Sequence, residues 1–233
     1  ATLTDSISYN TAVGYAAGVA LSTAQSCTLL GYGAGDSINT GGSNLCVGVS
    51  AAQSLTSGEQ NCAVGTGALN TDDQGDRTTA IGTSCLYNQN VGDEISYNVA
   101  VGYYAGGALS TGKFNTFLGY QAGMTSTNSG TGDSNTAVGY IAGNSMTSAA
   151  NNVLIGRNAG DLISTGGGNV CVGADTGSTG SANLESGSDN IIIGNLAQVA
   201  AHNQSNGICI GHNIAASAND FSFGKASNVV TND

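Results

Sequence analysis

The sequence predicts an all-β fold, a parallel β-solenoid (β-roll) in which each coil is one copy of a 17-residue repeat. Three observations predict it. An aliphatic residue followed by Gly recurs along the chain, the residues around that pair favour a short strand, and the composition is rich in small residues, with 37 Gly and only 8% charged residues among 233. A unit of this length is too short for a helical-hairpin repeat, which needs more than about 30 residues.

The repeat is defined by glycines that lie 17 residues apart in eight of twelve intervals. Two intervals are 20 residues, one is 21 and the last is 13, so the extra residues fall in the polar stretch between motifs. The residue before Gly is Val, Leu or Ile in twelve copies and Phe223 in the last. We therefore expect about 13 coils, built on Gly14, Gly31, Gly48, Gly65, Gly82, Gly102, Gly119, Gly139, Gly156, Gly173, Gly194, Gly211 and Gly224.

The local sequence predicts where strands and turns lie within each coil. Thr, Val and Ile before the motif Gly favour a strand, and the flanking Gly and Asn favour turns. A second extended segment is expected at the Leu-Ser-Thr part of the unit, where an apolar anchor often lies seven residues after Gly. Stacked coils ~4.8 Å apart would hydrogen-bond each strand to its neighbours. The expected organisation is a lead-in at 1–9, one repeat domain at 10–227 and a tail at 228–233.

The motif strand is apolar on both faces. Side chains alternate along a strand, so the residues one and three before Gly share a face, which we assign to the core. The residue two before Gly points the other way and is apolar in twelve of thirteen copies. An exposed apolar stripe is unusual for a monomer, so it predicts an interface between copies of the chain. That interface comprises Ala12, Leu29, Cys46, Ala63, Ala80, Ala100, Phe117, Ala137, Leu154, Cys171, Ile192 and Cys209.

Two further positions recur in register. Asn stands four residues before the motif Gly in nine copies and is expected to be a stacked turn residue, its amide bonded to backbone and to its copies. A Tyr follows Gly in several copies, and such a stripe either packs between chains or contacts a glycan. The tyrosines in this register are Tyr15, Tyr32, Tyr103, Tyr120 and Tyr140.

Composition and motifs exclude several functions. With 15 acidic and 4 basic residues, the chain cannot neutralise many phosphates, so we expect no nucleic-acid partner. No run of 18 apolar residues predicts a membrane helix. The acidic loop 70–76 lacks EF-hand spacing and is interpreted as a solvated turn, so no metal or other cofactor is expected. His202 and His212 lack a readable catalytic partner, and we expect no enzyme activity.

The six cysteines occupy mostly motif positions. Cys46, Cys171 and Cys209 share a register with Ala and Leu, as small buried apolar residues do. Cys62 stands one position earlier in the repeat than these three, on the opposite face of the strand to Cys46. No two cysteines in adjacent coils share a register, so no intrachain disulfide is expected, while copies in an oligomer could still meet.

The repeats NTAVGYAAG (10–18), NTFLGYQAG (115–123) and NTAVGYIAG (135–143) resemble the head repeats of trimeric autotransporter adhesins and related repeats of phage and virus tail fibres. The resemblance covers about residues 10–227. It implies a left-handed β-roll, a homotrimer around a threefold axis, and an extracellular position on a cell or virion surface.

The function expected from these features is a structural and adhesive fibre segment, a stiff spacer with an attachment surface for a cell-surface glycan or protein receptor. Its enlarged loops, 88–97, 125–134 and 176–189, are the expected contact surfaces. One alternative is a tailspike-like protein that binds or cleaves polysaccharide, for which cleavage needs two carboxylates ~5–9.5 Å apart. Another is an ice-binding solenoid that uses Ser/Thr rows such as Ser22-Thr23, Ser110-Thr111 and Ser164-Thr165.

Overall fold

The computed structural model describes residues 9–125, 130–178 and 183–231. In this part the chain is all-β, a parallel β-solenoid of about 12 turns with no helix, one turn fewer than the repeat count suggested. The chain divides into two compact units, residues 1–115 (unit 1) and 116–233 (unit 2). The predicted fold class is confirmed.

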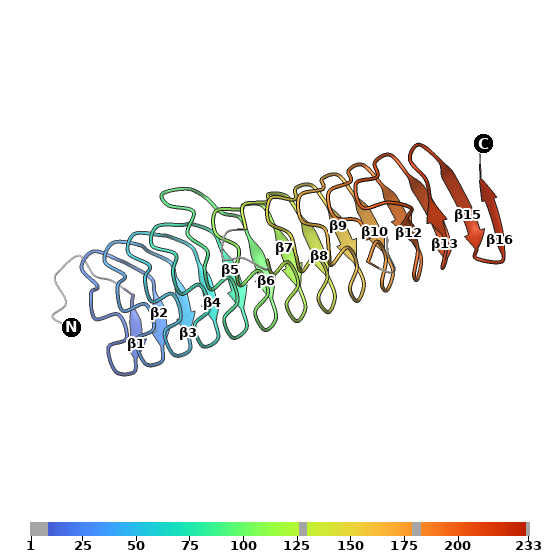
Figure 1. Ribbon diagram of the computed structural model, residues 1–233. Coiled ribbons are helices and arrows are strands. Elements are labelled where there is room, and N and C mark those ends of the chain that lie inside the picture. The colour runs from blue at the N-terminus through green and yellow to red at the C-terminus, as the bar shows by residue number, and fades with distance from the viewer. Residues whose placement is uncertain (1–8, 126–129, 179–182, 232–233) are drawn as a thin grey trace. The chain divides into compact units, whose positions relative to one another are not determined.

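Unit 1 contains six parallel strands that follow one another in chain order (Figure 1). Each strand is the three residues before a motif Gly, and equivalent residues are paired, as in Val47 opposite Val64 and Val64 opposite Ile81. The strands are β1 (Thr11–Val13), β2 (Thr28–Leu30), β3 (Leu45–Val47), β4 (Cys62–Val64), β5 (Thr79–Ile81) and β6 (Val99–Val101).

Unit 2 likewise contains parallel strands in chain order and ends in an antiparallel pair (Figure 1). The tail expected at 228–233 supplies the final strand through residues 228–231. The motif strands are β7 (Thr116–Leu118), β8 (Thr136–Val138), β9 (Val153–Ile155), β10 (Val170–Val172), β11 (Ile191–Ile193), β13 (Ile208–His212) and β15 (Phe221–Lys225). The others are β12 (Gln198–Val199) and β14 (Ala215–Ala216), which pair in a second sheet, and β16 (Asn228–Thr231).

The core of each unit is lined by the residues two before and seven after the motif Gly. Leu29 and Leu154 represent the first position and are fully buried. Ile38 and Leu55 represent the second, which confirms the predicted apolar anchor. The prediction that the residue one before Gly fills the core is wrong, because Leu30 is 47% exposed and Ile193 is 37% exposed.

The motif glycines permit close approach of neighbouring coils. Gly65 has φ +133°, and a Cβ built on it would lie 2.4 Å from the carbonyl oxygen of Gly82. A side chain would therefore collide with the next coil and occupy a strained backbone conformation. This explains why the aliphatic residue is followed by Gly in every copy.

The predicted Asn stack is confirmed. Asn44 is buried, and its Nδ2 donates to the carbonyl oxygen of Gly58 at 2.8 Å. Its Oδ1 accepts from the backbone N–H of Asn61 at 2.9 Å, in the next coil. The same pattern links Asn152 to Asn169 in unit 2. Each Asn therefore satisfies buried backbone groups at a corner where the strand ladder does not reach.

Candidate functional site

The interior holds no arrangement that identifies a cofactor site. Across the described residues, no group of three or more His, Cys, Asp and Glu side chains is placed to hold a metal ion. Those residues also include no helix long and apolar enough to cross a membrane. Candidate sites are therefore sought on the surface.

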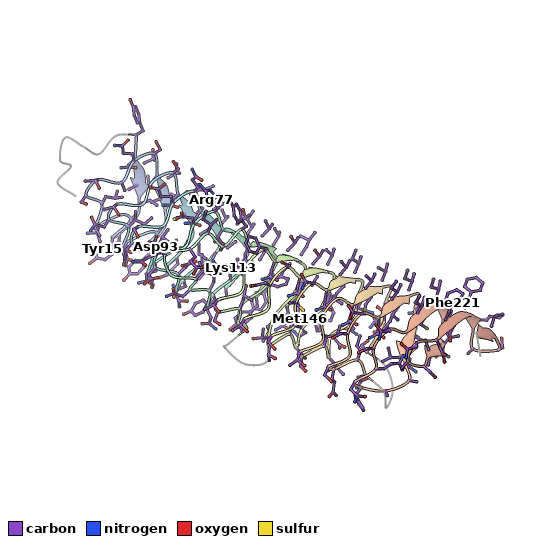
Figure 2. The ribbon with its side chains drawn as sticks, turned by 90° about the horizontal axis from the view of Figure 1, so that it is seen from above. Tyr15, Arg77, Asp93, Lys113, Met146 and Phe221 are labelled. Carbon is purple, nitrogen blue, oxygen red and sulfur yellow. The ribbon has the colours of Figure 1, made fainter. Side chains whose placement is uncertain are left out.

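The outward face of the motif strands, which we call the strand face, carries two columns of side chains, one apolar throughout and one of mixed Thr and apolar residues. They are the residues one and three before each motif Gly, and Figure 2 shows such side chains projecting from one edge of the ribbon as far as Phe221. From β9 to β15 in unit 2, both columns consist of Val, Ile and Phe alone. Contiguous exposed apolar surface of this kind is typical of an interface.

The residues predicted as the interface between copies do not lie on this face. All except Ala12 are buried in the core of their own chain, so they cannot contact another copy. Alternation correctly gave the two faces of the strand, but the assignment of inside and outside was reversed. Burial overturns the interface prediction for Leu29, Cys46, Ala63, Ala80, Ala100, Phe117, Ala137, Leu154, Cys171, Ile192 and Cys209, whereas Ala12 is exposed.

Five of the six cysteines are buried, and all six are free thiols. Burial raises the pKa of the Cys46, Cys85 and Cys171 thiols to about 12, so they are protonated and shielded at neutral pH. Cys62 differs, because it is half-buried on the strand face, paired in register with Leu45. It therefore offers a natural chemical probe of that surface.

The predicted tyrosines form exposed stacked pairs. In unit 1 the ring centroids of Tyr15 and Tyr32 are 5.4 Å apart with an interplanar angle of 13°. In unit 2 those of Tyr120 and Tyr140 are 5.3 Å apart at 11°. Tyr103 instead contacts its neighbour Tyr104 in a tilted arrangement. Contact of these rings with a glycan remains a prediction.

A second exposed column in unit 1 was missed at the sequence level. It lies five residues before the motif Gly and contains Arg77, Tyr97 and Phe114. The rings of Tyr97 and Phe114 stack at 5.8 Å, and the Arg77 guanidinium carbon lies 5.8 Å from the Tyr97 ring centroid. The only signal in the sequence is the count of five residues back from Gly82, Gly102 and Gly119.

The acidic loop 70–76 is not simply a solvated turn. Asp72 replaces the apolar anchor seven residues after Gly65 and is fully buried. Its Oδ1 accepts from the Gly75 N–H at 2.9 Å, and its Oδ2 accepts from Nε2 of Gln89 at 2.7 Å. Burial raises the pKa of the Asp72 carboxyl, although these hydrogen bonds oppose the shift.

The polar contacts continue from Asp72 across the core. Gln89 replaces the anchor of the next coil, and its Oε1 accepts from Nδ2 of Asn98 at 2.8 Å. Its Nε2 also donates to Oγ1 of Thr78 at 3.0 Å, the residue that interrupts the Asn stack. The buried carboxyl is thus joined to the Asn stack, which accounts for its position inside the solenoid.

Two side-chain contacts of unit 2 involve carboxylates at the surface. Arg157 pairs with Asp175, which also accepts from Nδ2 of Asn158 at 2.8 Å. Nδ1 of His202 lies 3.3 Å from Oε1 of Glu185, with both side chains about half exposed.

Of the enlarged loops, residues 88–97 are described, whereas 126–129 and 179–182 lie outside the described residues. In the first loop, Glu94 pairs with Lys113.

No match to this chain was found among protein-family models, curated proteins or solved structures.

Proposed function

We propose that the chain is a structural segment of a surface fibre, in which copies associate through the strand face and form a stiff spacer with attachment surfaces. The observation that carries this proposal is the exposed apolar side chains of the strand face, exemplified by Leu30 and Val99 in unit 1 and by Ile191 and Ile193 in unit 2, where both columns are apolar from β9 to β15. Burial of such side chains contributes about 25 cal/mol per Å² of apolar surface.

Charge favours association at this face over others. The chain carries a net charge of −11, so most contacts between copies would bring carboxylates together. The two columns contain no charged side chain, and their backbone is a row of short parallel strands. Two copies can therefore approach there without like-charge repulsion.

The number of copies and the setting follow from the repeat motif. Its resemblance to adhesin-head and tail-fibre repeats supports a homotrimer, displayed outside a cell or on a virion. In that setting the exposed pairs Tyr15–Tyr32 and Tyr120–Tyr140 are proposed contacts for a surface glycan.

The first test is the mass of the purified protein in solution. We expect three times the chain mass of 22.8 kDa by light scattering. Changing Ile191 and Ile193 together to Lys should give monomers that keep the circular dichroism of the wild type, because both side chains already face outward. The matched control Val19→Lys alters a side chain that is 61% exposed outside the strand face and should remain oligomeric. A monomeric wild type would refute the proposal.

A second test uses the native thiol of Cys62. A short bismaleimide should link two copies through Cys62, because the other five thiols are buried. Cys62→Ser should abolish the product, and Ile191→Lys with Ile193→Lys should reduce it. Cross-linking that persists in Cys62→Ser would place the contact elsewhere.

A further inference from the structure

The column five residues before the motif Gly has an unusual backbone. Residues there have positive φ, and most coils carry a small or polar residue, such as Ser26, Ser43 or Asn151. In unit 1, Arg77, Tyr97 and Phe114 occupy the same place with φ of 55°, 49° and 61°. Bulky residues are uncommon in this region of φ in proteins, but this fold also places Ile141 and Leu196 there, so the backbone groups the three side chains without assigning them a role.

These three side chains form a platform in solvent. Tyr97 is 48% exposed and Phe114 is 53% exposed. Their rings stack with centroids 5.8 Å apart, and Arg77 of the preceding coil lies over the Tyr97 ring, so Tyr97 presents mainly its ring edge to solvent. Arg77 is fixed against Tyr97, and its Nε donates to Oε1 of Gln60 at 2.8 Å.

A polar hollow lies in the preceding coils of the same corner. It has a volume of about 320 Å³ and is lined in part by Gln25, Ser26, Ser43 and Glu59. Backbone hydrogen bonds connect the column from coil to coil: Ser43 N–H donates to Gln25 O at 2.8 Å, and Arg77 N–H to Glu59 O at 3.0 Å. Because Glu59 lines the hollow and bonds to the backbone of Arg77, the hollow lies next to the Arg77 end of the platform.

Charge narrows the class of ligand. The carboxylates of Glu59, Asp76 and Glu94 lie on the coils that carry this surface, and Lys113 is paired with Glu94. These groups disfavour an anion. The guanidinium of Arg77 has no carboxylate within ion-pair distance among the described residues, so its remaining N–H groups can donate to a hydroxyl.

We propose that this corner of unit 1 binds a neutral oligosaccharide. One pyranose ring packs against the exposed ring edges of Tyr97 and Phe114, Arg77 donates to a hydroxyl, and the polar hollow accepts the next sugars. This inference rests on the proposed attachment function and names the class of ligand for it. The site is separate from the tyrosine pairs, and binding there does not require association of copies.

The experiment measures binding of cellohexaose, maltoheptaose and mannohexaose, with hexagalacturonate as the acidic counterpart, by titration calorimetry on the full chain. The variants are Tyr97→Asn and Phe114→Asn, because Asn tolerates positive φ and already stands at this position as Asn151. We expect at least one neutral oligosaccharide to bind. Each variant should weaken it about fivefold to tenfold, the loss of one aromatic contact.

Controls separate this site from folding and assembly. Val19→Ala trims a side chain of unit 1 that is 61% exposed and lies outside both this column and the tyrosine pairs, so it should change affinity by less than about twofold. Arg77→Gln should weaken binding without altering the solution mass. The proposal is overturned if no neutral probe binds more tightly than about 10 mM, if hexagalacturonate binds best, or if the Tyr97 and Phe114 variants bind like wild type. A monomeric protein that still binds would refute only the assembly part.

Discussion

At the scale of single residues, Asp161 is a carboxyl in an unfavourable environment. One of its oxygens is buried and lacks a hydrogen-bond partner among the described residues. Burial, with a smaller contribution from the charge of Asp175, raises the pKa of Asp161 to about 6. Between pH ~4 and 6 the folded chain therefore binds more protons at this site than the unfolded chain, so this site makes the fold more stable as the pH falls.

The prediction is that Asp161→Asn stabilises the protein at neutral pH, because it removes a poorly solvated charge. We expect roughly 1 kcal/mol or less, since the carboxyl is only half-buried and solvent screens it. The advantage over wild type should shrink as the pH falls through about 6 and vanish near 4, where the unfolded carboxyl is also protonated. Urea unfolding across this range measures it.

The control for this pH series is Asp93→Asn, which changes an exposed acid in unit 1. Its urea unfolding is measured over the same pH range. An advantage of Asp161→Asn that grows on acidification would contradict the assigned cause.

At the scale of the coil, the Asn stack holds successive turns together. Asn152 is buried, and its Oδ1 accepts from the Asn169 N–H at 2.9 Å. Its Nδ2 donates to the Gly166 carbonyl oxygen at 3.0 Å. Asn152→Ala would leave both buried groups without a partner, at a cost of about 1–3 kcal/mol for each unsatisfied group.

We therefore expect Asn152→Ala to lower the free energy of unfolding by about 3 kcal/mol in a denaturant titration. Asn203→Ala, at an exposed Asn of the same unit, should change it by less than about 0.5 kcal/mol. Equal effects of the two variants would mean that the stack contributes little.

The strands, turns and Asn stack could be predicted because each recurs in register. Which face of the strand points into the core could not be predicted. Alternation places Leu29 and Leu30 on opposite faces but does not say which of the two faces the core. Packing decides this, as where Phe117 fills the core because Gly123 has no side chain: a Cβ there would lie 2.2 Å from the Phe117 ring. The burial of Asp72 was also unpredictable, since it depends on Gln89, a residue in the next coil.

Of the two exposed columns of side chains, the tyrosine stripe could be predicted from the sequence and the column with Arg77, Tyr97 and Phe114 could not. The tyrosines share one residue type in one register, which makes their stripe visible in the sequence. Arg77, Tyr97 and Phe114 differ in type, and only their common backbone position unites them. A surface built from unlike side chains is seen only when the coils are aligned in space.

At the scale of the whole molecule, stability is distributed along the chain in neighbouring coils. In unit 1 the backbone bonds join adjacent coils, as from Gly35 N–H to Ala51 O at 2.9 Å, and in unit 2 from Gly143 N–H to Ala159 O at 3.0 Å. In such repeat proteins the free energy is approximately a sum of coil terms and nearest-neighbour terms. A single unfolding free energy then describes the chain less well than local values do.

A core substitution in one coil should therefore destabilise that coil and its neighbours and leave distant coils unchanged. Leu55→Ala removes a fully buried anchor in unit 1 and should cost about 2–5 kcal/mol. In native-state hydrogen exchange, we expect faster exchange in the surrounding coils, β2 to β5, and unchanged protection in β9 and β10 of unit 2. The reciprocal variant Leu154→Ala should accelerate exchange around β8 to β10 and leave β2 to β4 unchanged. Since each variant is the other's control, equal acceleration in both units would show that the chain opens as one cooperative unit, contrary to nearest-neighbour energetics.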